Sequence, residues 1–235
     1  MEVLRAVWRD VLGAQAPPTG EIAWLCALVA LAVVALPRTW RYSRVAITVA
    51  HEGAHAAVGV LCGRRLSGVT LHSDSSGLTL SRGRSTGPGM VATAAAGYPG
   101  PALLGLAAAY LLSRDHALAV LWLAVLLLGL LLLWIRNLYG LLAVGVALAL
   151  VGAVSWWAEA RWQSATAYVG TWVLLLGAPR AVVDLAYARC HDRRRASDAD
   201  VLARLTRVPA VVWVGLFGFT TVVAVVLAGR LLLLR

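Results

Sequence analysis

Residues 49–59, VAHEGAHAAVG, place three ionisable side chains on one turn of an apolar segment. His51 and His55 are four residues apart, so on a helix both imidazoles lie on one face and can reach the same metal ion. Glu52 projects beside them, where a carboxylate can take a proton from an attacking water. Ionisable groups inside a membrane span are costly, so a functional site is a better account of them than a chance cluster facing a polar cavity. We therefore predict a zinc site with His51 and His55 as ligands and Glu52 as the general base.

The composition indicates that lipid, and not water, surrounds most of the chain. Hydrophobic residues make up 60% of the 235 residues and charged residues only 14%, which is too apolar for a soluble domain of this length. The net charge is +10, and each of the 21 basic residues is Arg. These arginines lie in short gaps between apolar runs, which favours a role in membrane orientation over nucleic-acid binding. The composition therefore predicts the lipid bilayer as a partner, with no nucleic acid.

The pattern of apolar runs predicts an all-α polytopic membrane helical bundle of about six to seven transmembrane helices in a single domain, 1–235. Residues 1–20 form an amphipathic N-terminal segment, and no cleavable signal peptide is expected there. Seven runs are long enough to cross a hydrocarbon core of about 30 Å. They lie near residues 21–36, 45–62, 88–112, 117–135, 138–155, 165–183 and 208–229.

Assigning the gaps alternately to two sides gives an orientation. The side that holds the N-terminus, residues 63–87, Arg136 and residues 180–207 collects most of the arginines. The positive-inside rule places this side in the cytoplasm. We therefore expect the N-terminus and the opening of the active site to be cytoplasmic, with His55 about 10 Å from the cytoplasmic end of its helix.

Residues 66–84 predict a short cytoplasmic β-hairpin after the motif. Alternating Thr, Val and Leu near residues 69–72 and 78–81 flank the turn Ser-Asp-Ser-Ser-Gly, which is a hairpin signal. An ordinary loop hairpin explains this pattern. An edge strand beside the site, able to pair with an extended peptide, explains it equally well.

A zinc site needs a third protein ligand, and the cytoplasmic connection 184–207 supplies the candidates. In this connection Ser197 and Asp200 have the spacing of a capping box at the start of a short helix. That structural role accounts for Asp200 and leaves Asp198 as the preferred metal ligand. Asp184 and Asp200 remain the alternatives.

Two further features bear on the site. GYPGP, residues 97–101, interrupts an apolar run, and such breaks at membrane depth line a cavity or mark a packing kink. Asn137 is the only Asn in the chain and begins another run on the side of His55. It is a candidate substrate-binding residue that donates to a substrate carbonyl, and a helix cap is the simpler alternative.

These residues resemble the site-2 protease family of intramembrane zinc metalloproteases, and more narrowly a small bacterial peptidase-like branch of it. The resemblance spans roughly residues 45–220 and rests on motifs in the expected order: HEGAH, GVTLHSDSSGLT, AGYPGP, RNLYG and SDADVLARLT. It implies a Zn²⁺ ion, a Glu general base, and cleavage of a substrate transmembrane helix near its cytoplasmic end. It also implies a membrane-protein or peptide substrate as a partner, and a bacterial plasma-membrane location.

The sequence departs from the family at the third ligand. The family's usual ligand is an Asp in a Leu-Asp-Gly or Pro-Asp-Gly motif on a later span, and here Ser-Asp-Ala around Asp198 stands in its place. The leading hypothesis is therefore a zinc metallopeptidase. A catalytically weak membrane scaffold or chaperone that retains the metal site is the alternative, and a metal or solute transporter is a weaker one.

Overall fold

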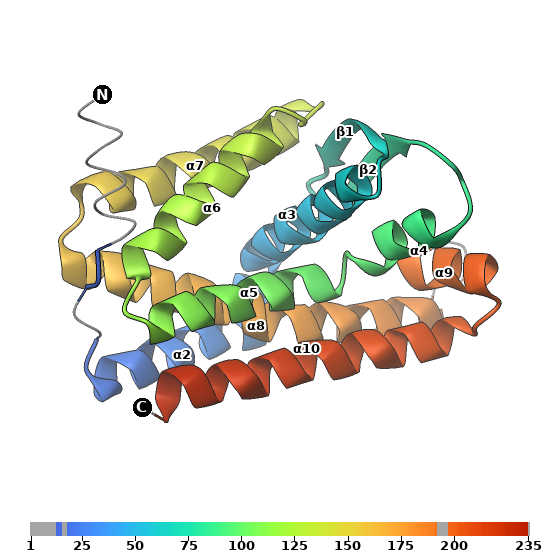
Figure 1. Ribbon diagram of the computed structural model, residues 1–235. Helices are drawn as coiled ribbons and strands as arrows, with labels where there is room; N and C mark the ends of the chain where they lie inside the picture. Colours follow the sequence, from blue (N-terminus) through green and yellow to red (C-terminus); the bar gives the residue numbers. More distant parts are fainter. Residues whose placement is uncertain (1–12, 16–17, 192–196, 235) are drawn as a thin grey trace.

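The computed structural model describes residues 13–15, 18–191 and 197–234, and over these residues the chain is mostly helical (Figure 1). The helices are α2 (Gly20–Ala35), α3 (Pro37–Leu61), α4 (Pro88–Ala95), α5 (Pro99–Ser113), α6 (Ala117–Leu132), α7 (Leu138–Trp157), α8 (Ala160–His191), α9 (Asp198–Thr206) and α10 (Ala210–Leu233). Strands β1 (Arg65–Leu71) and β2 (Gly77–Arg82) form one antiparallel hairpin. The predicted helical architecture with a small hairpin is confirmed.

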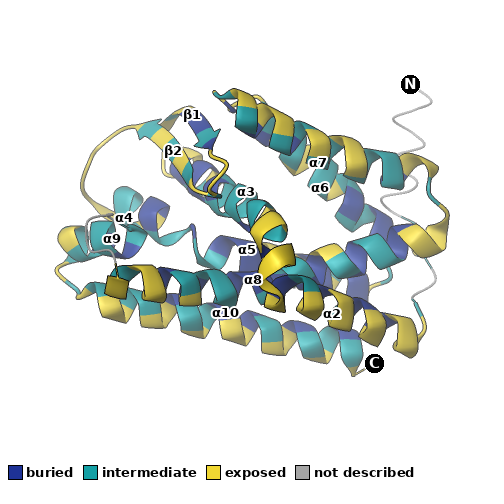
Figure 2. Ribbon diagram, turned by 180° about the vertical axis from the view of Figure 1, so that it is seen from behind, coloured by how far each residue is buried: buried dark blue, intermediate teal, exposed yellow. Residues whose placement is uncertain are grey.

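Helices α2, α5, α8 and α10 form the packed centre of the molecule. Their shared core is rich in alanine, with Ala30, Ala109, Ala178, Ala224 and Ala228 fully buried. Small side chains let helix backbones approach closely, which is how helices associate in a lipid environment. The outward faces of the helices are apolar and exposed, as at Leu28, Leu126 and Phe219. Exposed residues (yellow in Figure 2) run along the outside of the bundle. Apolar residues on the outer surface as well as in the core are typical of a membrane protein.

By length and composition, the helices α7, α8 and α10 can each cross a membrane. Two bent pairs, α2 with α3 and α4 with α5, bring the number to five if each pair is one span. Helix α6 has 16 residues, which is short for a core of about 30 Å. The described residues thus contain three to five candidate spans. The predicted count of six to seven is not confirmed, because the predicted runs near 21–36 and 45–62 form one bent pair and the run near 117–135 forms a helix of only 16 residues.

The bend between α2 and α3 changes the predicted order of spans. The sequence predicts a polar gap at residues 37–44, but α3 already begins at Pro37, a residue suited to the first turn of a helix. The chain turns by 101° at this point. Arg180 of α8 donates hydrogen bonds to the carbonyl oxygens of Val34 and Ala35, which satisfies the end of α2. Helix α3 therefore leaves α2 at a steep angle and does not run antiparallel to it.

Helices α2 and α8 run in the same direction, whereas alternation of the predicted spans gives them opposite directions. Near the start of both helices Cys26 faces Ala165, and near the end of α2 Val34 faces Arg180. Gln15 contacts the turn between α5 and α6, at the end of the molecule opposite to the hairpin (Figure 1). The prediction that the N-terminal segment shares a side with the hairpin is therefore corrected at Gln15, while residues 1–12 lie outside the described residues. The physical reason is the α2–α3 bend, which removes one crossing.

The hairpin packs on α3 and continues into a third segment beside β1. In the hairpin Val69 pairs with Thr79. On the other edge of β1, the Val69 N–H donates to the Trp134 carbonyl at 2.8 Å, and the Arg136 N–H donates to the Val69 carbonyl at 2.9 Å. The predicted hairpin is confirmed, and its first strand starts earlier than expected, at Arg65. The segment between α6 and α7 thus fixes the hairpin from the side away from β2.

The predicted break at residues 97–101 is also present. Helix α4 ends at Ala95, α5 begins at Pro99, and the two axes differ by 69°. The predicted capping box of Ser197 and Asp200 begins the short helix α9. Helix α8 extends to His191, so the first part of the predicted 184–207 connection is helical, and residues 192–196 lie outside the described residues. Helix α4 packs on α3, and α9 packs on α4 (Figure 1). The first residue of α9, Asp198, thereby reaches the side chains of His51 and His55.

Candidate metal centre

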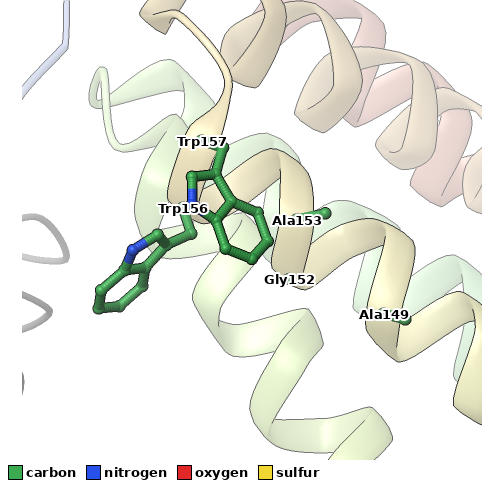
Figure 3. Close-up of a pocket in the computed structure, with 5 residues that line it drawn as sticks. All are labelled: Ala149, Gly152, Ala153, Trp156 and Trp157. Atoms are coloured by element: carbon green, nitrogen blue, oxygen red, sulfur yellow. The ribbon is translucent and has the colours of Figure 1, made fainter.

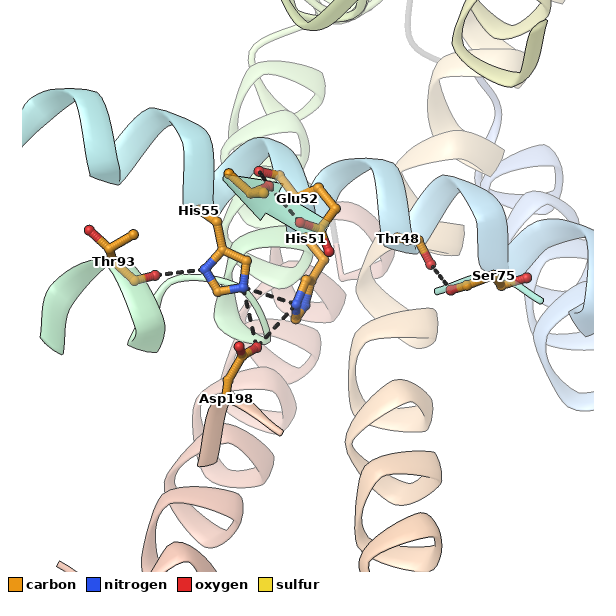
Figure 4. A network of polar contacts seen from close by, with 8 residues as sticks. Thr48, His51, Glu52, His55, Ser75, Thr93 and Asp198 are labelled. Atoms are coloured by element: carbon orange, nitrogen blue, oxygen red, sulfur yellow. Dashed lines mark hydrogen bonds and ion pairs between the residues drawn. The ribbon is translucent and has the colours of Figure 1, made fainter. Parts of the chain in front are cut away.

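His51 and His55 project from one face of α3 toward α9, as the four-residue spacing predicts (Figure 4). Their Nε2 atoms are 3.1 Å apart. His55 is buried, and the side chain of His51 is partly accessible. The two rings meet edge to face, with centroids 4.6 Å apart. This arrangement points two imidazole nitrogens at one position next to the helix.

Asp198, the first residue of α9, brings a carboxylate oxygen to the same position. Its Oδ2 lies 3.2 Å from His51 Nε2 and 3.2 Å from His55 Nε2 (Figure 4). A tetrahedral zinc with bonds of about 2.0–2.1 Å separates its ligand atoms by about 3.3 Å. The triangle formed by these three atoms therefore has the size of one face of such a site. Among the described residues, no other group of three His, Cys, Asp or Glu side chains could hold a metal ion.

The charge state of Asp198 suits a cation. Burial alone would raise the pKa of this carboxyl, but hydrogen bonds from His51 and His55 hold the pKa well below its usual range. The carboxylate is thus ionised at neutral pH. An ionised carboxylate next to two imidazoles is a donor set that zinc prefers.

The orientation of His55 is set by a partner on its far side. Its Nδ1 lies 2.7 Å from the backbone carbonyl oxygen of Thr93, in α4 (Figure 4). A carbonyl oxygen only accepts hydrogen bonds, so Nδ1 carries a hydrogen, and Nε2 is the ring nitrogen that is left to coordinate a metal ion. Metal-binding histidines are generally held by such a second partner. Nothing in the local sequence of Thr93 signals this role, because the contact depends on how α4 packs on α3.

Gly97, in the break between α4 and α5, borders the same position. A Cβ added at Gly97 would lie 2.5 Å from His51 Cε1 and 2.6 Å from His51 Nε2, and closer still to His55 Nε2. Only a residue without a side chain fits against both rings. The break in AGYPGP is visible in the sequence, but the specific need for Gly97 appears only when α5 is placed against α3.

Tyr98 follows Gly97 and packs on the other side of His51. Their ring centroids are 4.8 Å apart at nearly a right angle, and Tyr98 stacks in turn on Phe217 of α10. An aromatic contact of this kind restricts the orientation of the His51 ring. The break therefore contributes both the space beside the imidazoles and a wall behind one of them.

Glu52 is almost fully buried, with 4% of its surface exposed, and its carboxylate faces the hairpin. The Thr79 hydroxyl donates to Glu52 Oε2 at 2.5 Å. Gly77 leaves room for the same side chain, since a Cβ there would lie 2.5 Å from Glu52 Oε1. Glu52 thus stands beside the cluster of His51, His55 and Asp198 but is not one of its three ligand atoms.

The other candidate aspartates have partners elsewhere. Asp184 accepts a hydrogen bond from Trp40 Nε1 at 3.0 Å. Asp200 accepts hydrogen bonds from Ser197 and forms an ion pair with Arg189 at 2.5 Å. Burial acts to raise the pKa of Asp200, but the hydrogen bonds from Arg189 and Ser197 lower it to about 2. The structure therefore brings Asp198, and neither alternative, to the two histidines.

Asn137 has a different partner from both of those expected. Its side chain accepts a hydrogen bond from the Leu71 N–H at 3.1 Å and donates to the Leu71 carbonyl at 2.5 Å. It stands at the N-cap position of α7 but makes no side-chain cap. The amide thus makes the two hydrogen bonds that the backbone of a neighbouring strand would make with Leu71. Strand β1 lies between Asn137 and β2. The structure does not bring Asn137 to the histidines, and its amide holds the hairpin at Leu71. A role in binding substrate stays a prediction.

A surface hollow on α7 lies far along that helix from Asn137. It is lined by Ala149, Gly152, Ala153, Trp156 and Trp157 (Figure 3). None of these side chains can ligate a metal or transfer a proton at neutral pH. The hollow is therefore separate from the candidate centre, which lies where α3, the break and α9 meet.

Comparison with known proteins adds one finding. No curated protein and no solved structure matches the chain. A family model described as Peptidase M50B-like matches residues 24–228, which include the hairpin, the break and all three clustered side chains. The match covers most of the chain and agrees with the predicted resemblance to site-2 proteases. The chain belongs to the Peptidase M50B-like family.

Proposed function

We propose that this protein is an intramembrane zinc metalloprotease that hydrolyses peptide bonds of transmembrane substrates. The observation that carries the proposal is the approach of three ligand atoms, from His51, His55 and Asp198, to 3.1–3.2 Å of one another. Glu52, which the reaction needs as a base, lies on the same turn of α3. Membership of a peptidase family supports peptide hydrolysis as the chemistry.

The residues present fit a catalytic zinc. Two imidazoles and one carboxylate are the ligand set of several zinc peptidases, and three protein ligands leave a fourth position open. When bound there, Zn²⁺ would polarise the scissile carbonyl and make water a stronger acid. Glu52 accepts the proton of the attacking water and passes it to the leaving amine. Thr93 holds His55 in the required tautomer, and Gly97 keeps the space beside the rings clear.

The substrate has to be extended at the point of cleavage. In a helix the backbone hydrogen-bonding groups are already paired with one another, and the scissile bond is buried within the helix. The hairpin supports this reading, since β2 lies against Glu52 and a peptide can pair with a strand edge. A substrate helix would therefore unwind near the membrane surface before it is cut. Water would reach the centre from the same side.

We place this site at the cytoplasmic face of a bacterial plasma membrane. Most described arginines lie at the end of the molecule that holds the hairpin and α9, and the positive-inside rule assigns that end to the cytoplasm. Three arginines belong to the other ends of the helices: Arg114 follows α5, Arg161 lies in the first turn of α8 and Arg230 in the last turn of α10. Figure 1 shows these helix ends away from the hairpin and α9. The bacterial location follows from the family resemblance.

The direct test of the base is Glu52→Gln, which preserves shape and removes the carboxylate. Casein labelled with a self-quenching fluorophore offers extended segments and serves as the probe for the protein in detergent micelles. We expect Glu52→Gln to bind zinc as the wild type does and to lose at least about 100-fold in cleavage rate. Full cleavage by a zinc-loaded Glu52→Gln protein would overturn the mechanism. Zinc binding without any Glu52-dependent cleavage would overturn the proposed protease function. It would favour the alternative function, a membrane scaffold that retains the metal site.

The ligand set is tested by the zinc content of purified variants. Asp198→Ala should lose bound zinc to about the same extent as His55→Ala, because each removes one of three ligands. Asp184→Ala is the matched control, since it removes an aspartate that is bonded to Trp40. Full zinc occupancy in Asp198→Ala, measured by elemental analysis after dialysis, would exclude Asp198 as the third ligand.

A further inference from the structure

The proposed base is held by the hairpin and not by its own helix. Thr79 Oγ1 lies 2.5 Å from Glu52 Oε2 and 3.2 Å from the Glu52 carbonyl oxygen. Gly77, two residues earlier on β2, is the second contact, because only a missing side chain leaves space for Glu52. A hydrogen bond to a buried carboxylate is among the stronger ones in proteins, so this contact fixes where the carboxylate points.

The backbone of Thr79 faces a different direction from its hydroxyl. In an antiparallel pair, two opposed residues either bond to each other or both turn their N–H and C=O outward. Val69 and Leu71 turn outward, because they bond to Trp134, Arg136 and Asn137 on the far edge of β1. Their partners, Thr79 and Gly77, therefore also turn outward, at the open edge of β2.

That edge of β2 is available for pairing. Over the residues that the structure describes, the sheet contains only β1 and β2, so no third strand lies beside β2. Leu78 and Leu80 are each 51% exposed and point away from α3, while Thr79 points toward it. An extended peptide added at this edge would form its hydrogen bonds with Gly77 and Thr79, the same two residues that contact Glu52.

We propose that Thr79 is a positioning residue that couples an extended peptide, paired with the edge of β2, to the carboxylate of Glu52. This inference rests on the proposed function. One residue then does two things: its backbone sets the register of the peptide, and its hydroxyl aims the base. The distance between scissile bond and base is fixed by the covalent geometry of Thr79, because both contacts come from the same residue.

The test compares Thr79→Val, which keeps the shape and removes the hydroxyl, with Thr79→Ser, which keeps the hydroxyl. Thr70→Val is the matched control, since Thr70 lies on the same hairpin but pairs with Leu78 on the face away from Glu52. With quenched casein as the probe, Thr79→Val should lower kcat about 10- to 100-fold and change KM less than about twofold. Thr79→Ser should recover most of the lost kcat, and Thr70→Val should resemble the wild type.

A second readout needs neither zinc nor activity. In the metal-free protein, the infrared difference between wild type and Glu52→Gln contains the band of the Glu52 carboxyl group. Loss of the Thr79 hydroxyl should shift this band, whereas Thr79→Ser and Thr70→Val should leave it in place. A merely structural role for Thr79 would not separate the Val and Ser variants in this way.

The outcomes separate the inference from the proposed function. Glu52-dependent cleavage that is unchanged in Thr79→Val would overturn the inference alone. Equal loss of kcat in Thr79→Val and Thr79→Ser would also overturn it, since the hydroxyl would then not matter. The absence of any Glu52-dependent cleavage by the wild type would overturn the proposed function and the inference with it. Zinc content equal to that of the wild type shows that a variant has folded.

Discussion

In the helical bundle, Gly105 of α5 lies against Leu175 of α8, whereas at the candidate centre Gly97 lies against the imidazoles of α3. Both glycines sit where an added Cβ would collide with a neighbour. In the bundle the neighbour is an apolar side chain, which can shift at a moderate cost. At the centre the neighbours are two ring nitrogens whose positions define the site.

The two regions are also held together differently. The bundle core consists of small and apolar side chains, so its stability is spread over many weak contacts. The centre depends on a few polar contacts between distant segments, from Thr93 to His55, from Thr79 to Glu52 and from Arg189 to Asp200. The bundle should therefore tolerate small changes in packing, whereas the centre should lose its geometry when one contact is changed.

The largest effect is expected for Gly97→Ala. Its Cβ would occupy the space next to His51 Nε2 and His55 Nε2, where the ion would bind. We expect zinc affinity to fall at least about 100-fold, as for the loss of a ligand contact. Isothermal titration of the metal-free protein measures this affinity. Gly53→Ala is the control, because it lies between the two histidines but meets nothing within 4 Å. Equal zinc affinity in the two variants would mean that Gly97 does not shape the site.

A smaller effect, on stability alone, is expected for Gly105→Ala. The added Cβ would lie 2.8 Å from Leu175 Cγ, so α5 and α8 must move apart slightly. Overpacking of this kind costs about 1–3 kcal/mol and should leave zinc affinity unchanged. Thermal unfolding in detergent should show a lower midpoint than for the wild type. Gly170→Ala on α8 has open space around it and should not lower the midpoint. Loss of zinc binding in Gly105→Ala would show that the two regions are coupled.

The smallest effect is expected for Arg189→Gln, which acts on the centre through α9. Arg189 bonds to Ser197 at 3.0 Å and to Asp200 at 2.5 Å, and so holds the first turn of α9, where Asp198 begins. Removing the charge loosens this turn, and we expect zinc affinity to fall about 10-fold. Arg204 is exposed on α9, so Arg204→Gln is the control and should leave the zinc affinity unchanged. If both variants bind zinc equally, α9 is positioned by its apolar face alone.

Much of the candidate centre can be predicted from local sequence. The spacing of His51, Glu52 and His55 puts them on one turn, whatever surrounds the helix. The hairpin, the break at residues 97–101 and the capping box of Ser197 and Asp200 also follow from local preferences, and each is present. The choice of Asp198 followed from the capping box, since it left this aspartate without a structural role.

Other features depend on contacts between distant segments and have no local signal. Asn137 could be recognised as unusual, but its partner Leu71 is 66 residues away. The predicted number of spans is not confirmed, because the apolar runs near residues 21–36 and 45–62 look alike in sequence whether or not the chain bends by 101° between them. The direction of α2 relative to α8 followed from the same bend.

Residue types and local geometry are therefore enough to predict an apolar chain with two imidazoles and a carboxylate on one helical turn, followed by a hairpin and a break. These depend on residue type and on the fixed geometry of one turn of helix or one strand pair. Only the tertiary structure decided which aspartate meets the histidines, what Gly97 and Thr79 are next to, and at which end of the bundle Gln15 lies. The physical reason is that these relations arise from packing between segments far apart in the chain, which no local preference specifies.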